Sequence, residues 1–251
     1  MQYHIQLDEE MIEHAIYALL PGDPDRVSVI AGFLERPRPL AKSREFTSYL
    51  GYLDDVPVLV ISHGIGGPST AICVEELAHI GVKNFIRIGT SGGMQMEVQA
   101  GDVVIANAAI RQEGTSLEYL PVEYPAVSDY QITTALKNAA DRLGFRSHVG
   151  VVQCKDSFYG QHSPESMATK DALLSKWEAW CRCGTLVSEM ETAALFSVAI
   201  TRRLRAGAVL LCIWNQEREK AGCAHEECFD TTRPIRVAVS AVKQLIEAGE
   251  Q

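Results

Sequence analysis

The sequence predicts an α/β protein with a three-layer α/β/α architecture around a mixed, partly parallel central sheet. Short apolar runs typical of buried strands alternate with amphipathic segments typical of helices along the whole chain. Strand, helix and strand patterns follow one another over residues 56–89, and such a βαβ unit makes its two strands parallel. No repeat, low-complexity stretch or Pro/Ser-rich linker divides the chain, so we expect a single domain over residues 1–251.

The N-terminal part predicts a strand, a short helix and a hairpin. Ala15–Leu20 is an apolar run that ends at a Pro-Gly-Asp-Pro turn, which is typical of a strand that enters a loop. Asp25–Leu34 then indicates a short helix. Tyr49–Leu53 and Val56–His63 flank a pair of aspartates, and the second run is rich in β-branched residues, so together they predict a β-hairpin.

The middle of the chain supplies the βαβ unit. Pro68–Ile80 predicts a helix, because a proline opens it, apolar residues share one face, and a glycine follows it. Phe85–Gly89 and Val103–Ala109 are apolar enough to be buried strands. The same patterns continue to the C-terminus, with helices expected over Tyr130–Leu143, Lys170–Trp180, Met190–Arg202 and Thr232–Ala248 and strands over His148–Gln153 and Ala206–Trp214.

Composition narrows the function classes. The chain has 251 residues, with 23 Lys and Arg against 32 Asp and Glu, and its net charge of −9 excludes a basic surface for nucleic acid. No window approaches the twenty or so apolar residues that a membrane span needs. The acidic N-terminus has no apolar signal segment, so we expect a cytoplasmic protein.

The cysteines are expected to be free thiols. Their number, seven, is odd, and Cys73, Cys154 and Cys212 lie in apolar runs typical of a core. A second group of Cys and His residues has spacings that match no standard zinc pattern, so no metal is required there: Cys181, Cys183, Cys223, His225 and Cys228. Gly64–Ser69 is likewise a poor dinucleotide fingerprint and a better strand-to-helix turn, since a serine replaces the last glycine.

Several arginines, glycines and hydroxyls follow predicted strands, where ligands of α/β sheets gather. Gly22 and Arg26 share one loop, and Thr90 follows a strand that contains Arg87. Arg44, in the segment Ser43–Phe46, adds a third guanidinium group. Guanidinium groups, hydroxyls and glycine backbone N–H groups can all donate hydrogen bonds to a tetrahedral oxyanion such as phosphate. A surface ion pair is the simpler interpretation of each arginine alone, but Arg87 lies in a buried strand, where an unpaired charge is costly.

The stretch Ser188–Ala194 places two carboxylates, Glu189 and Glu191, just before an apolar helix. They can interact with the positive end of the helix dipole. Alternatively, one of them can grip the vicinal hydroxyls of a sugar, since a carboxylate accepts two hydrogen bonds at once.

Five motifs together resemble the nucleoside phosphorylases of the first structural family, and are most similar to its bacterial uridine phosphorylases. The motifs occur in the family's order, and the resemblance runs from about His4 to the C-terminal helix: Pro21–Arg26, Arg44–Thr47, Gly64–Ser69, Arg87–Gly92 and Glu189–Glu191.

The resemblance implies a role for each matching residue. Phosphate, a co-substrate, would be bound by Gly22, Arg26, Arg87 and Thr90, with Arg44 supplied by a neighbouring subunit. His4 of the neighbour, Met190 and Glu191 would hold the ribose, and Phe158 would pack on sugar or base. Glu45, Ile65 and Ser69 match positions that can hold a monovalent cation such as K+ between subunits. No other cofactor is implied, and the assembly would be a homodimer or a trimer of dimers.

The base-binding segment departs from the family pattern. Familiar uridine phosphorylases have Pro-Gly-Gln-x-Arg after a Phe-Tyr pair, whereas this chain lacks the proline and has Ser163 in place of the arginine. Gln161 can satisfy the N3–H and one carbonyl of uracil. We expect Lys155 and His162 to replace the missing arginine, although each on its own is equally well explained as a solvated loop or strand-end residue.

The favoured activity is phosphorolysis of uridine to uracil and ribose 1-phosphate. A purine nucleoside phosphorylase or a nucleosidase of the same fold is the first alternative, but many of those place an acidic aspartate where this chain has Asn215. A non-catalytic nucleoside-binding protein is the second, and it would not need phosphate and ribose residues together.

Overall fold

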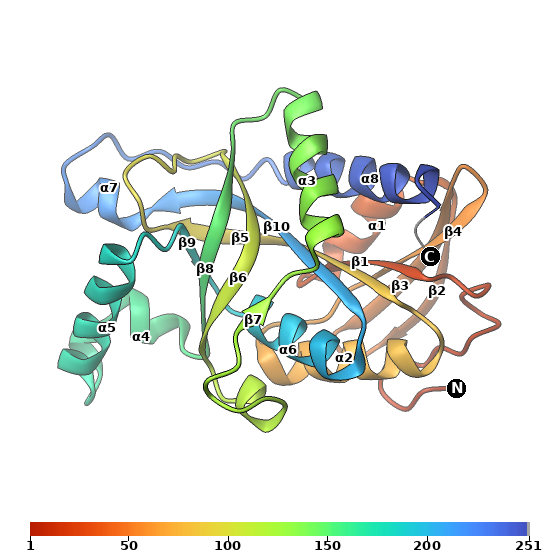
Figure 1. Ribbon diagram of the computed structural model, residues 1–251, viewed down its shortest axis with the longest axis horizontal. Helices are drawn as coiled ribbons and strands as arrows, with labels where there is room; N and C mark the ends of the chain where they lie inside the picture. Colours follow the sequence, from red (N-terminus) through yellow and green to blue (C-terminus); the bar gives the residue numbers. More distant parts are fainter. Residues whose placement is uncertain (250–251) are drawn as a thin grey trace.

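The computed structural model describes residues 1–249 and contains a mixed ten-stranded sheet with helices on both faces (Figure 1). The strands are β1 (Tyr17–Pro21), β2 (Glu35–Ser43), β3 (Phe46–Leu53), β4 (Val56–Ile61), β5 (Asn84–Gly93), β6 (Val103–Gln112), β7 (Ala126–Val127), β8 (Ser147–Lys155), β9 (Val187–Glu189) and β10 (Arg205–Asn215). The helices are α1 (Asp25–Ala31), α2 (Gly67–His79), α3 (Tyr130–Arg142), α4 (Phe158–His162), α5 (Lys170–Arg182), α6 (Thr192–Arg202), α7 (Gln216–Lys220) and α8 (Thr232–Glu247), with 3-10 turns at Thr115–Glu118 and Pro164–Ser166. Residues 250 and 251, which complete the predicted domain, lie outside the described residues.

The sheet is mixed, as predicted. Strand β1 pairs in parallel with β4 and β5, and β5 pairs in parallel with β10. The β3–β4 hairpin and the β6–β10 pair are antiparallel. The predicted βαβ unit is β4–α2–β5, and β1 lies between its two strands. The fold class expected from the sequence is therefore confirmed.

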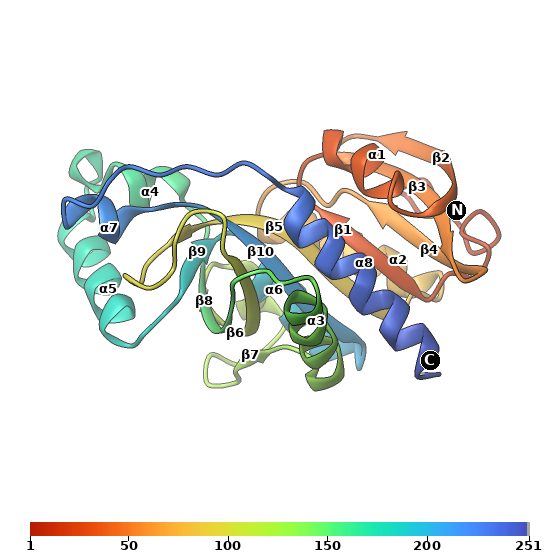
Figure 2. The same cartoon turned by 90° about the horizontal axis from the view of Figure 1, so that it is seen from above.

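The pairing goes further than an open sheet. β5 pairs with β10 along its length and with β9 at its end, while β10, β6, β8 and β9 pair in succession. These five strands close on themselves, and Figure 2 shows them on the opposite side of the molecule from β2, β3 and β4. The sequence did not predict this closure, since it depends on sheet curvature and on β9, which has only three residues.

Both faces of the sheet are buried, because neighbouring residues of each central strand point to opposite sides. Leu19, Ile86 and Val209 pack in the core beneath α1, α3 and α8. Leu20, Phe85 and Leu210, each adjacent in sequence to one of those residues, pack beneath α2 and α6. The three layers therefore follow from apolar runs that have no polar face.

The main differences from the predicted elements are at short or polar segments. β2 is largely exposed and contains prolines and arginines, so it carries no apolar alternation. The segment expected to be a loop at Phe158–His162 is the short helix α4, in which the side chain of Ser157 accepts a hydrogen bond from Gly160 N. Helix α6 begins at Thr192 rather than Met190. Within residues 1–249, none of the helices is long and apolar enough to cross a bilayer.

The seven cysteines are free thiols, and Cys73, Cys154 and Cys212 are buried as predicted. Among residues 1–249, no group of three His, Cys, Asp or Glu side chains is arranged to hold a metal ion.

Candidate active site

A cleft of about 950 Å³ opens at the carboxyl ends of β1, β5, β8, β9 and β10. It brings together residues that are far apart in the sequence, and most of the predicted site residues line it. These are Gly22, Arg26, Glu45, Ile65, Ser69, Arg87, Thr90, Lys155, Phe158, His162, Met190 and Glu191. His4, Arg44 and Gln161 do not line it.

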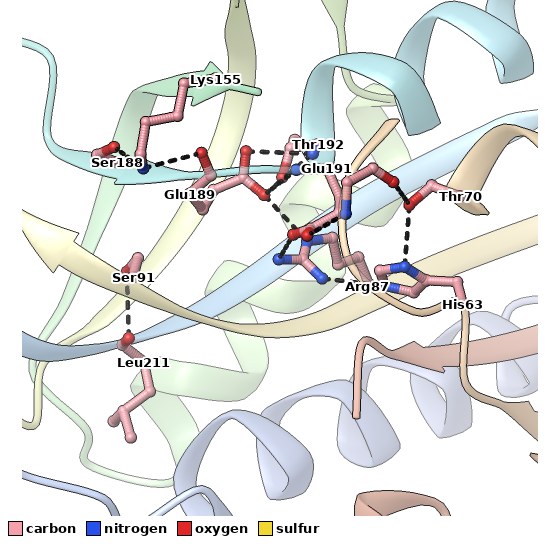
Figure 3. A network of polar contacts seen from close by, with 11 residues as sticks. His63, Thr70, Arg87, Ser91, Lys155, Ser188, Glu189, Glu191, Thr192 and Leu211 are labelled. Carbon is pink, nitrogen blue, oxygen red and sulfur yellow. Dashed lines mark hydrogen bonds and ion pairs between the residues drawn. The ribbon is translucent and has the colours of Figure 1, made fainter. Parts of the chain in front are cut away.

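Arg87 lies at the floor of this cleft and is almost completely buried (Figure 3). Its Nε donates to Glu189 Oε2 at 3.1 Å and its Nη2 to Glu191 Oε2 at 2.5 Å. The sequence indicated that the buried charge of Arg87 would be balanced by a bound anion. In the structure, Glu189 and Glu191 already pair with this charge. Burial lowers the pKa of Arg87, but Glu191 and Glu189 outweigh it and raise that pKa above its ordinary value.

The two carboxylates have different partners. Glu189 accepts hydrogen bonds from the backbone N–H groups of Glu191 and Thr192, both at 3.0 Å from Oε2, and so stabilises the start of α6. Glu191 Oε1 instead accepts from Gly66 N at 2.7 Å. The helix-start interpretation is therefore confirmed for Glu189, whereas the contact of Glu191 with a sugar stays a prediction. Burial raises the pKa of Glu191, and nearby Glu189 acts in the same direction while Arg87 opposes it.

Arg26 and Gly22, both predicted to bind phosphate, line the cleft close to Arg87. Arg26 Nη1 is buried and, within residues 1–249, has no hydrogen-bond partner. A Cβ at Gly22 would lie 3.1 Å from the carbonyl oxygen of Gly64 and 3.9 Å from Arg87 Nη1, so a bare backbone fits closely against the guanidinium. Burial and the charge of Arg87 lower the pKa of Arg26. Two guanidinium groups converge here, and an anion between them would relieve their repulsion.

Another part of the cleft combines a buried amine with aromatic rings. Lys155 Nζ donates to Ser188 Oγ at 2.7 Å, and burial lowers the pKa of this lysine. The rings of Phe158 and His162 lie 4.2 Å apart, and His162 is 5.7 Å from the Trp214 ring. Burial and the charge of Lys155 lower the pKa of His162. A flat heterocycle would find stacking partners and one cationic donor here.

Gln161 lines a smaller adjoining cavity of about 180 Å³, whose wall includes Lys155. Its Oε1 accepts from Ser188 Oγ at 2.7 Å, and its Nε2 lies 3.3 Å from Gln216 Oε1. The structure thus joins Gln161 to Lys155 through Ser188, a residue that the sequence analysis did not assign to the base. A single serine carries no spacing signal, so nothing in the sequence indicated that Ser188 would link Gln161 to Lys155.

His4 and Arg44 do not line their own chain's cleft, although both act electrostatically on Glu45, which does line it. His4 Nδ1 is 2.6 Å from Glu76 Oε1, and Arg44 occupies the β2–β3 turn with φ 53°. Their contribution to a neighbouring subunit stays a prediction.

The three residues predicted to hold a monovalent cation gather at the rim. Ser69 Oγ lies 2.7 Å from Glu45 Oε1 and 2.5 Å from the carbonyl oxygen of His63, and the Ile65 side chain is 78% exposed. Carboxylate, hydroxyl and carbonyl oxygens are the donors that hard cations prefer.

Both ends of the Asn215 side-chain amide are hydrogen-bonded to the backbone. Its Nδ2 donates to the carbonyl oxygens of Gln95 and Val98, and its Oδ1 accepts from Glu217 N and Arg218 N at the start of α7. It is therefore neither an acid nor free to donate to a purine ring.

The cleft thus combines a buried arginine paired with two carboxylates, a second guanidinium, and a buried lysine near aromatic rings, a set of groups suited to a phosphorylase that acts on nucleosides. The chain belongs to the phosphorylase superfamily, whose family model matches residues 16–247. It is 55% identical to a uridine phosphorylase of Treponema pallidum over 98% of this chain and 94% of that protein. It is 39% identical to the Escherichia coli uridine phosphorylase over 97% and 98% of the two chains, and 36% identical to a Halorubrum lacusprofundi guanosine phosphorylase over 97% and 99%. The protein is thus a pentosyl-transferring enzyme of the nucleoside phosphorylase class.

Proposed function

We propose that the protein is a uridine phosphorylase, which reversibly converts uridine and phosphate to uracil and ribose 1-phosphate in pyrimidine nucleoside salvage. The observation that carries this proposal is the single cleft that Arg26, Arg87 and Thr90 line together with Glu191 and with Lys155. These three groups match the phosphate, the sugar and the base of the reaction.

The mechanism follows from the distribution of charge. Phosphate held by Arg26, Arg87, Gly22 and Thr90 attacks the anomeric carbon as the glycosidic bond loosens. Glu191 accepts hydrogen bonds from the ribose hydroxyls and fixes the sugar against the anion. The base leaves with negative charge, which the buried Lys155 and its neighbour His162 stabilise.

The purine alternative is tested by the base end of the site. A purine phosphorylase of this fold would place an acid at the end of β10, where Asn215 has both ends of its amide occupied. Guanosine is therefore the informative control substrate, since a guanosine phosphorylase is among the relatives. Turnover of guanosine faster than uridine would reverse the assignment.

The decisive experiment is a spectrophotometric assay of uridine cleavage with and without inorganic phosphate. Phosphate-dependent release of uracil is expected. Equal rates in both conditions would indicate a nucleosidase, and uridine binding without turnover would indicate a non-catalytic nucleoside-binding protein.

The active assembly is proposed to be a homodimer or a trimer of dimers, in which Arg44 and His4 complete the neighbour's site. Neither residue is among those that line their own chain's cleft, which supports this arrangement. Mixed oligomers of Arg44→Ala and Glu191→Ala subunits should regain activity, because some of their sites would combine an intact Arg44 with an intact Glu191. No recovery in oligomers shown to have mixed would contradict shared sites.

No cofactor is needed for this chemistry, since phosphate is the co-substrate. A structural K+ at Glu45, Ile65 and Ser69 is proposed, and the proximity of the Glu45 carboxylate to the Ser69 hydroxyl supports it. Activity and thermal stability should then be higher in KCl than in tetramethylammonium chloride at equal ionic strength. We also propose a cytoplasmic location, which the seven free thiols support.

A further inference from the structure

His63 lies beside Arg87 (Figure 3). It follows β4, is fully buried and is not among the residues that line the cleft. Its Nε2 is 3.0 Å from Arg87 Nη1, and its Nδ1 is 2.9 Å from Thr70 Oγ1 at the first turn of α2. The imidazole therefore bridges the arginine at the floor of the cleft and the helix that follows the Gly64–Gly67 turn.

The partners of His63 fix its tautomer. A guanidinium N–H is only a donor, so Nε2 must accept and carries no proton. The proton is then on Nδ1, which donates to Thr70 Oγ1, and the Thr70 hydroxyl in turn donates to the carbonyl oxygen of Gly66 at 3.0 Å. Burial, together with the charges of Arg87 and Arg26, holds the pKa of His63 well below its ordinary value.

These bonds form a closed circuit with Glu191. The backbone N–H of Gly66 donates to Glu191 Oε1 at 2.7 Å, and Arg87 Nη2 donates to Glu191 Oε2 at 2.5 Å. The phosphate residue Arg87 and the ribose residue Glu191 are thus joined twice, once directly and once through His63, Thr70 and Gly66. A shift of the imidazole would move both residues.

The circuit also determines which N–H groups of Arg87 can meet a substrate. A guanidinium carries five N–H groups, and within residues 1–249 three of them are taken by Glu189, His63 and Glu191. One N–H on each Nη remains. Two such groups can bind two oxygens of one phosphate, provided that the guanidinium is held against rotation.

We propose that His63, in its neutral Nδ1–H form, is a positioning residue that holds Arg87 for phosphate and, through Thr70 and Gly66, Glu191 for ribose. The inference rests on the proposed function, because it assigns those ligands to Arg87 and Glu191. His63 touches no substrate, so its effect should appear as a change in phosphate binding rather than as loss of a reacting group.

Two substitutions separate the two bonds of the imidazole. His63→Gln places an amide oxygen near the position of Nε2 and keeps an acceptor for Arg87, whereas His63→Asn keeps a donor near Nδ1 for Thr70 and leaves Arg87 without an acceptor. His148→Asn is the control, since His148 is a partly buried histidine that is hydrogen-bonded to Asp102 at 2.8 Å and has no contact with Arg87 or with the cleft. Inorganic phosphate is titrated by calorimetry, and KM is measured separately for phosphate and uridine.

His63→Asn should raise the Kd and KM for phosphate by about 10- to 150-fold, the usual effect of losing a hydrogen bond to a charged group. His63→Gln should stay within about threefold of wild type, and His148→Asn should leave both constants unchanged even if its melting temperature falls. Equal losses in His63→Gln and His63→Asn, or unchanged phosphate affinity in His63→Asn, would overturn the proposal.

The tautomer is tested on the unaltered protein, so it does not depend on the variants folding. Nitrogen-15 NMR of labelled histidine, with the His63 signals assigned by their absence in His63→Gln, should show that the His63 ring is neutral and protonated at Nδ1 from pH 8 down to pH 6. An imidazolium or an Nε2–H tautomer at His63 would contradict the proposal. Neither this measurement nor the phosphate titration depends on which nucleoside is cleaved, so a failed uridine assay and a failed His63 role are distinguishable.

Discussion

Replacing Arg87 with methionine should destabilise the protein as well as remove a phosphate contact. Methionine has similar length and no charge, so the main change is that Glu189 and Glu191 lose the cation that pairs with both of them. Both carboxylates are buried, with 4% and 6% of their surface exposed. Removing one partner of a buried ion pair typically costs about 3–5 kcal/mol, because an uncompensated charge remains.

The assay is thermal and urea-induced unfolding of wild type and Arg87→Met at pH 7.5 and pH 5. For a chain of this size, 1 kcal/mol corresponds to a shift of about 2–4 °C, so a fall of about 6–20 °C is expected at pH 7.5. Burial already raises the pKa of Glu191, and loss of the opposing charge of Arg87 raises it further in the folded variant, so the penalty on Glu191 belongs to its ionised form. That part of the penalty should therefore shrink as the pH falls towards 5 and Glu191 protonates.

A double variant provides the control. Arg87→Met with Glu191→Gln has one unpaired buried charge fewer and should regain part of the lost stability at pH 7.5. Loss of phosphate affinity with a change in stability below about 1 kcal/mol would show that the ion pairs are not structural and that Arg87 serves its ligand alone.

Three further predictions follow from other parts of the site and core. Burial and the charges of Arg87 and Arg26 hold the pKa of His63 well below its ordinary value in the folded protein, so wild type should lose stability, on the order of 1 kcal/mol, as the pH falls from 8 to 5.5, and His63→Gln should not lose this part. Urea unfolding at both pH values measures the difference. Lys155→Ala or His162→Ala should lower kcat/KM for uridine about 10- to 150-fold, and near-normal values in both would mean that another donor binds the base. A Cβ at Gly207 would lie 2.4 Å from Ile132 Cγ2, so Gly207→Ala should cost about 1–3 kcal/mol of unfolding free energy in urea, and an unchanged midpoint would show that α3 can move away.

The strands and helices of the central layers were readable from local pattern. The runs at Phe85–Gly89 and Ala206–Trp214 are apolar on both faces, and the predicted strands lie within β5 and β10. Short elements were missed because they lack such a pattern. β9 has three residues, and β2 is stabilised by pairing with β3 rather than by burial.

The candidate site, like the fold, was predicted from the sequence only in part. Residue types at strand ends, such as Arg26 and Thr90, were sufficient to predict an anion site, because parallel strands deliver their carboxyl ends to one edge. The sequence did not reveal what those residues contact. Gln161 lies in the adjoining cavity, where its amide contacts Ser188 and Gln216, and its contact with the base stays a prediction.

The amino-acid order therefore determined the layers, the location of the cleft and the chemical class of its ligand, since each depends on periodicity within a few neighbouring residues. Tertiary structure alone decided that Arg87 pairs with Glu191, 104 positions away, and that His63 lies beside it. The physical reason is that a buried charge accepts whichever partner the packed layers bring within hydrogen-bond distance. That partner depends on how the strands pair and curve, and no local pattern encodes it.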